Sequence, residues 1–207
     1  MIEIFISSFI SAITLLTFGT FFCNIFLKQN SFSDKDFAEN SLFGIIFLSF
    51  LALIINFIFP INKSIGNIVF LITLILSIKY FINTKDRKKL FLFLSYSSII
   101  TFFLILLSNV NRPDAGLYHL PYISLINENK VILGSANIHF RFGHISIIQY
   151  LSGIYNNSFF STSSITIPLA SIVSIFIIYL VKKFNLLFKK KNNLSFIIFL
   201  ILIFGLT

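Results

Sequence analysis

The sequence predicts an all-α, polytopic transmembrane protein, and two observations lead to this prediction. Of the 207 residues, 57% are hydrophobic and only 11% are charged, whereas soluble domains average about 45–50% apolar and about 25% charged residues. The apolar residues also form long blocks, most of which approach the ~20 residues that a helix needs to cross a bilayer. Because these blocks lack the alternation of polar and apolar residues seen in barrel strands, we expect helices.

Six apolar blocks predict about five full spans and a truncated sixth. The first block carries Glu3 at its start, where a signal peptide would carry basic residues, and its apolar run exceeds that of a signal peptide, so we expect a retained span. The last block would cover only ~21 Å as a helix, which is too short to cross. We therefore expect residues 1–207 to form the N-terminal part of a single integral membrane domain. The blocks are residues 4–27, 42–59, 68–82, 90–108, 159–181 and 194–207.

The basic residues are concentrated in two short loops, "NTKDRKK" (residues 83–89) and "KKFNLLFKKKNN" (residues 182–193). Cytoplasmic loops carry an excess of Lys and Arg, so both loops are expected inside the cell. One span leaves the first loop and one returns to the second, which predicts that residues 109–158 form an extracytoplasmic loop. The net charge of +9 then reflects topology, and we expect no nucleic acid as a partner.

Within that loop, "FGHISIIQYLSGIY" (residues 142–155) is a further apolar stretch. If it crossed the membrane, the lysines of residues 182–193 would be exported. We therefore expect a short re-entrant or interface-lying helix, which would serve as a platform beside a membrane-embedded substrate or as an amphipathic anchor.

The candidate site begins in "RPDAGLYHLPY", residues 112–122. Pro113 biases Arg112 toward extended geometry, and Asp114 before Ala-Gly suits a turn or a helix N-cap. Asp114 also follows the fourth span closely enough to lie near lipid head groups. Pro121 fits the first turn of a short helix ending at about Asn127. Tyr118 and His119 would lie where this helix meets the Asp114 turn.

A second candidate stretch is "GSANIHFRFGH", residues 134–144, in which Asn137, His139 and Arg141 alternate with apolar residues. An extended backbone would put these three polar side chains on one face. They could then form a phosphate clamp, with the guanidinium supplying a bidentate fork, or simply face water. His139 and His144 are five residues apart, which is not the spacing of a helical zinc pair, so we expect no metal site.

Residues 114–143, "DAGLYHLP…NENKVILGSANIHFRFG", resemble a loop in an uncharacterised family of bacterial multi-pass membrane proteins. That family in turn looks like the GT-C glycosyltransferases, which take a sugar from a polyprenyl-phosphate carrier and have an acidic residue in an outer loop near the membrane. The resemblance implies that Asp114 acts as general base. It also implies that His139 and Arg141 neutralise the leaving polyprenyl phosphate. The full set of substrate-binding residues would be Arg112, Tyr118, His119, Asn137, His139 and Arg141.

If the resemblance holds, the protein is a glycosyltransferase-like enzyme of a bacterial plasma membrane, with membrane lipid and a lipid-linked sugar as partners. The sequence identifies no cofactor, and it leaves open whether a divalent cation is required. The sequence departs from many GT-C members because no second acid adjoins Asp114 and because several spans precede the loop. The alternatives are a transporter or flippase for lipid-linked glycans, a polymerase, or a non-catalytic membrane subunit. A transporter usually places ionisable residues at mid-membrane depth, and none of the six apolar blocks has a central charge.

Overall fold

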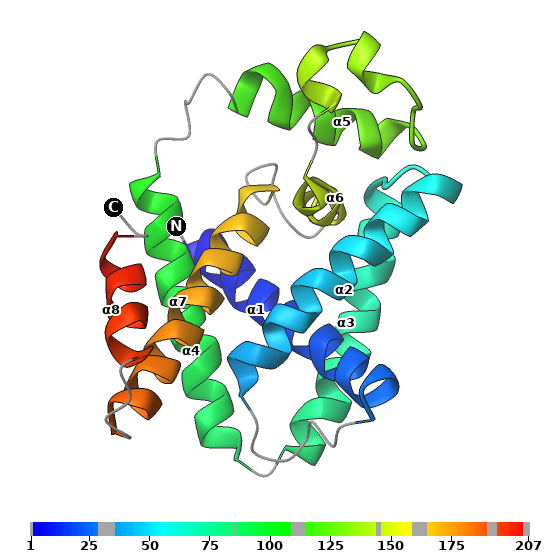
Figure 1. Ribbon diagram of the computed structural model, residues 1–207. Coiled ribbons are helices and arrows are strands. Elements are labelled where there is room, and N and C mark those ends of the chain that lie inside the picture. The colour runs from blue at the N-terminus through cyan, green and yellow to red at the C-terminus, as the bar shows by residue number, and fades with distance from the viewer. Residues whose placement is uncertain are drawn as a thin grey trace.

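The computed structural model describes residues 2–28, 36–84, 86–108, 115–143, 146–158, 165–189 and 194–204. Every regular element within these ranges is a helix, which confirms the all-α class (Figure 1). Five helices are long and apolar enough to cross a membrane, in agreement with the predicted number. They are α1 (Ile2–Phe26), α2 (Phe37–Ile58), α3 (Lys63–Asn83), α4 (Arg87–Leu107) and α7 (Ile167–Lys189). The sixth apolar block gives α8 (Leu194–Phe204), which has 11 residues and is too short to span.

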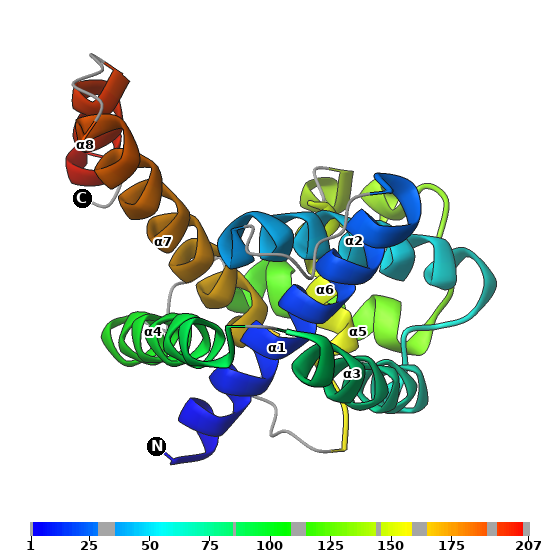
Figure 2. The ribbon, with the colours of Figure 1, turned by 90° about the horizontal axis from the view of Figure 1, so that it is seen from below.

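Helix α1 runs through the middle of the bundle and packs against α2, α3, α4 and α7 (Figure 2). Its buried side is rich in small hydroxyl residues. All but one of these hydroxyl groups donate to a carbonyl oxygen about one turn earlier in α1; Ser8 Oγ, for example, lies 2.7 Å from Ile4 O. The exception is Ser11, which hydrogen-bonds outside α1. The small side chains leave room for neighbouring helices to approach closely. The buried hydroxyl residues are Ser7, Ser8, Ser11, Thr14, Thr17 and Thr20.

Helices α1 and α2 approach each other closely at two glycines. A Cβ added to Gly19 would lie 1.7 Å from Asn40 O, and one added to Gly44 would lie 1.8 Å from Leu15 O. No side chain fits at these distances. The two backbones are therefore in direct contact, and glycine is required at both positions.

Residues 115–143 form a set of short helices, here called the cap, at one end of the bundle (Figure 1). They comprise a π-helical turn η1 (Ala115–His119), α5 (Leu120–Glu128) and two 3₁₀ turns, η2 (Ser135–Asn137) and η3 (Phe140–Gly143). Helix α5 has Pro121 in its first turn and ends close to Asn127, as the sequence predicts. Ile61, between α2 and α3, donates its N–H to Ile126 O at 2.9 Å, which joins the cap to this end of the spans.

The prediction of an extended backbone around Asn137, His139 and Arg141 is wrong, because the chain turns twice there. Gly134, with φ of +78°, starts η2, and the Asn137 N–H donates to Gly134 O at 2.8 Å. The Phe142 N–H likewise donates to His139 O at 2.8 Å. The backbone thus satisfies its hydrogen bonds locally, so alternation in the sequence does not put the three polar side chains on one strand face.

The apolar stretch of residues 142–155 contains a short helix, α6 (Ile147–Ile154), which lies between the cap and the spans (Figure 1). It has eight residues, too few to cross a bilayer. Its end enters the bundle: Tyr155 is fully buried, and its hydroxyl lies 2.9 Å from Ser11 Oγ of α1. Ser171 of α7 donates to the same Ser11 hydroxyl at 2.9 Å. The segment is therefore part of the packed interior and not a surface anchor.

The described residues of the two basic stretches lie at the end of the bundle away from the cap, and residues 182–189, predicted as a loop, are the last turns of α7. Lys182 Nζ of α7 lies 3.1 Å from Oδ1 of Asp36, the residue before α2. At the start of α4, Asp86 accepts from the Lys89 N–H at 3.3 Å and forms an ion pair with Lys89 Nζ at 2.6 Å. These two interactions with Lys89 hold the pKa of the Asp86 carboxyl below its usual value. We call this region the basic end; its described cations include Arg87, Lys88, Lys89, Lys182, Lys183 and Lys189.

Candidate functional site

The centre of the candidate site is a pairing of Arg141 with Tyr118. Tyr118 lies in η1 and Arg141 in η3, so the cap brings together residues far apart in the sequence. The Arg141 guanidinium carbon lies 4.7 Å from the centroid of the Tyr118 ring and 5.6 Å from that of Phe140. Each such cation–π contact is worth about 0.5–1 kcal/mol at an exposed site. The two rings therefore orient the guanidinium.

His119 joins this pair to α6. Its Nδ1 lies 2.7 Å from Nε2 of Gln149, and its ring centroid lies 4.2 Å from that of Tyr118. Which of the two groups donates depends on the tautomer of the His119 ring. The contact holds the His119 ring beside Tyr118.

His139 packs inside the turn that carries Arg141. Its ring stacks on Phe140 with centroids 5.0 Å apart and contacts Phe142 at 5.3 Å. Its Nδ1 accepts from the Arg141 backbone N–H at 3.3 Å. His139 therefore supports the backbone that presents the guanidinium.

A layer of aromatic rings underlies the site and connects it to α6. The buried Phe142 ring packs against Tyr122 at 5.4 Å, and the Tyr122 hydroxyl lies 2.7 Å from the Tyr150 hydroxyl. Burial, together with this hydrogen bond, raises the pKa of the Tyr122 phenol above its usual value. Tyr122 stays protonated at neutral pH and serves as a structural support.

The structure thus groups four of the predicted residues: Tyr118, His119, His139 and Arg141. Asn137 is exposed in η2, beside Gly134. Because the backbone is not extended here, the prediction that Asn137 and Arg141 share one strand face does not hold. Asp114 and Arg112 lie outside the described residues, so their predicted roles stay predictions.

Sequence reasoning missed two residues that organise this region. Gln149 holds His119, and Asn127 of α5 accepts from Asn156 Nδ2 at 2.7 Å and donates to Ile123 O at 2.6 Å. The only signal in the sequence was an amide side chain inside a mostly apolar stretch. Such a residue is usually hydrogen-bonded when it is buried, but the sequence gives no indication of its partner.

The described residues contain no group of three or more His, Cys, Asp or Glu side chains that could hold a metal ion. His144, which the sequence analysis considered together with His139, is outside that part of the chain.

Fold and site together define a polytopic α-helical membrane protein with a helical cap at one end of the bundle and cationic residues at the other. The chain belongs to the family described as "Domain of unknown function (DUF8201)", whose model matches residues 1–207. No curated protein and no solved structure matches it.

Proposed function

We propose that the chain is the membrane part of a GT-C-type glycosyltransferase, which takes a sugar from a polyprenyl-phosphate donor at the outer face of a bacterial plasma membrane. The observation that supports this most is the Arg141 guanidinium over the Tyr118 ring in the cap. The positive-inside bias assigns the basic end to the cytoplasm. The cap, at the far end of the 22-residue helix α2, would then meet lipid head groups of the outer leaflet.

The cap residues suit the phosphate of such a donor. A guanidinium can bind two phosphate oxygens at once, and Arg141 is oriented for this by Tyr118 and Phe140. The His119 ring, 4.2 Å from the Tyr118 ring centroid, would add a second polar group beside the phosphate. The polyprenyl chain would extend into the bilayer beside the spans.

In the proposed reaction, the acceptor hydroxyl attacks the anomeric carbon of the sugar and the bond from that carbon to the phosphate oxygen breaks. The carboxylate of Asp114, one residue before η1 in the sequence, would take the hydroxyl proton. General base catalysis of this kind contributes about 10²–10⁴-fold. Arg141 would stabilise the negative charge that develops on the leaving polyprenyl phosphate.

A flippase for the same lipid is less well supported. Transporters commonly bury ionisable residues at mid-membrane depth. Among the described residues, no Asp, Glu, Lys, Arg or His side chain is fully buried; the buried polar residues of the spans are Ser, Thr and Asn. The described spans therefore favour a site at the membrane surface over a pathway through the bundle.

The proposal is tested in proteoliposomes with polyprenyl-phosphate hexoses as donors. The variant Asp114→Asn is expected to lower sugar transfer at least 100-fold while binding of polyprenyl phosphate, followed by native mass spectrometry, stays at the wild-type level. Arg141→Gln is expected to weaken that binding. Lys130→Gln, which removes an exposed cation elsewhere in the cap, is the matched control and should change neither quantity.

Two results would contradict the proposal. Full transfer by the Asp114→Asn variant would exclude this carboxylate as the base. Movement of the donor lipid between leaflets with no transfer to any hydroxyl acceptor would favour the flippase.

A further inference from the structure

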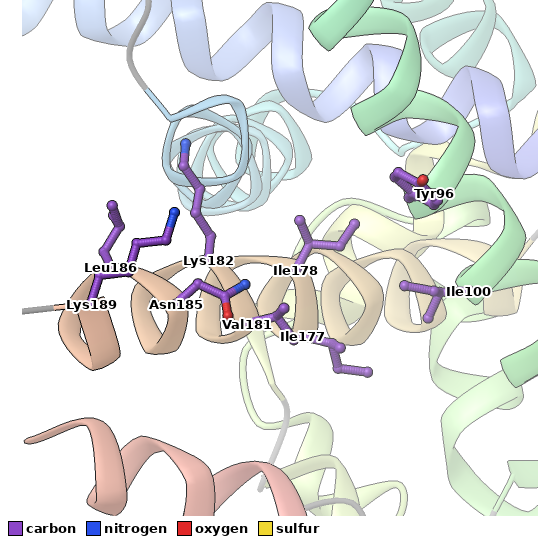
Figure 3. A pocket seen from close by; sticks show the side chains of 9 residues that line it. All are labelled: Tyr96, Ile100, Ile177, Ile178, Val181, Lys182, Asn185, Leu186 and Lys189. Atoms are coloured by element: carbon purple, nitrogen blue, oxygen red, sulfur yellow. The ribbon is translucent and has the colours of Figure 1, made fainter.

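A groove between α4 and α7 runs from the middle of these helices toward the basic end. It is open on one side and has a volume of about 430 Å³. Figure 3 shows its wall: Tyr96 and Ile100 project from α4, and aliphatic side chains, including Ile177, line the α7 side. The mouth also carries two cations, Lys182 and Lys189, whose side chains leave α7 on the same side (Figure 3). The groove therefore combines an apolar wall with a cationic rim.

The position of Lys182 indicates how deep in the membrane this rim lies. Its Nζ lies 3.1 Å from Asp36 Oδ1, and Asp36 directly precedes the membrane-spanning helix α2. Lys182 is therefore level with the start of α2, at the boundary between lipid and water. Ile177, five residues earlier in α7, is about 7 Å deeper at ~1.5 Å per residue.

The rim stays cationic although acidic groups are close. Asp36 and Lys182 also line a second cavity of about 220 Å³ beside the groove, together with Asp86 and Lys89. Each of these aspartates is matched by a lysine at ion-pair distance. Lys189 adds a further positive charge at the groove. The Asn185 side chain lines the same mouth and offers amide N–H donors.

We infer that this groove binds one anionic phospholipid of the leaflet at the basic end. The phosphate would lie at Lys182 and Lys189 and accept from the Asn185 amide, and an acyl chain would lie along the wall formed by Ile100 and Ile177. Basic pockets between transmembrane helices are suited to anionic head groups, and the apolar wall favours a phospholipid over free phosphate. This inference does not depend on the proposed function, which concerns the opposite end of the bundle.

The test is native mass spectrometry of the purified full chain titrated with phosphatidylglycerol or with phosphatidylcholine of the same acyl chains. Wild-type protein should retain phosphatidylglycerol preferentially. Lys189→Gln should reduce that preference about fivefold, the effect expected for one basic residue near a lipid surface, and it leaves the Lys182–Asp36 pair intact. Val181→Trp fills the groove, because Val181 is part of its lining, and should reduce retention of the anionic lipid further.

The matched control is Lys183→Gln. Lys183 is adjacent to Lys182, but its Nζ lies 5.2 Å from the centroid of the Tyr179 ring and it does not line the groove. This variant should bind lipid as wild type does.

Three outcomes would overturn the inference. The first is equal retention of the two lipids by wild-type protein. The second is an equal loss in the Lys183→Gln and Lys189→Gln variants, which would indicate a diffuse charge effect. The third is a lipid-free dimer in the same spectra, since a second copy would then occupy the groove.

Discussion

At the scale of single residues, Asn56 holds the cap on the bundle. It is fully buried near the end of α2, and its Nδ2 lies 3.2 Å from Ile126 O and 3.0 Å from Asn129 O, both in the cap. Its backbone carbonyl also accepts from the Val131 N–H at 3.1 Å. One side chain and its own backbone thus connect a spanning helix to two parts of the cap.

We expect Asn56→Asp to loosen the cap without unfolding the spans. The substitution keeps the size of the side chain but replaces the amide donor by an acceptor that faces two carbonyl oxygens. A buried polar group left without a partner costs about 1–3 kcal/mol. Hydrogen–deuterium exchange at Val131 and its neighbours should therefore accelerate about 5–100-fold.

The control for this prediction is Asn83→Asp, a chemically identical change at an exposed asparagine at the end of α3. It should leave exchange in the cap unchanged. If exchange at Val131 in the Asn56→Asp variant stayed at the wild-type rate, other contacts would have to hold the cap.

At the scale of elements, the α1–α2 contact depends on Gly19. A methyl group there would lie 1.7 Å from the Asn40 carbonyl oxygen, so Gly19→Ala must push the two helices apart. Overpacking of this kind costs about 1–3 kcal/mol or more. Cys23, the only cysteine in the chain and buried one turn further along α1, reports the separation directly. Its modification by a thiol reagent in detergent should be faster in the variant than in wild type.

Gly116→Ala is the matched control, because a Cβ at Gly116 would meet no atom within 4 Å. Reactivity of Cys23 should stay at the wild-type rate in this variant. The close contact between α1 and α2 would be disproved if both glycine variants reacted alike.

The elements show how far the sequence determines this fold. The predicted span of residues 90–108 corresponds to α4, Arg87–Leu107; the helix starts earlier than its apolar run because Asp86 caps it and the first charged turn faces water. Length and hydropathy suffice for such helices, because lipid leaves the backbone few alternatives. The same reasoning failed around His139, where alternation suggested a strand but there is no neighbouring strand to pair with in the described part of the cap.

The candidate site was predictable in its residue types but not in its geometry. Tyr118, His119 and Arg141 could be selected because polar and charged residues are scarce in this chain. The contact between Tyr118 and Arg141, and the support of His119 by Gln149, depend on how η1, η3 and α6 pack together. Packing between short helices is set by tertiary contacts and leaves no periodic signal in the sequence.

At the scale of the whole molecule, the two ends of the bundle differ in charge. Helix α2 begins beside the Lys182–Asp36 pair and ends at Asn56 and the cap, so the basic end and the cap are about 33 Å apart at ~1.5 Å per residue. This separation matches the thickness of a bilayer core. We therefore expect the cap and the basic end on opposite sides of the membrane.

The positive-inside bias predicts which side is which, and thiol labelling in intact bacterial cells can test it. In a Cys23→Ser background, Asn137→Cys introduces a thiol at an exposed position of the cap, and Lys88→Cys introduces one at an exposed position of the basic end. A membrane-impermeant maleimide should label the Asn137→Cys variant in intact cells and the Lys88→Cys variant only after the membrane is opened, because the excess of Lys and Arg predicts a cytoplasmic location for the basic end. The reverse pattern would put the cap inside the cell and remove the basis for an extracytoplasmic transferase site. Labelling of both variants in intact cells would mean that the two ends are not separated by the bilayer.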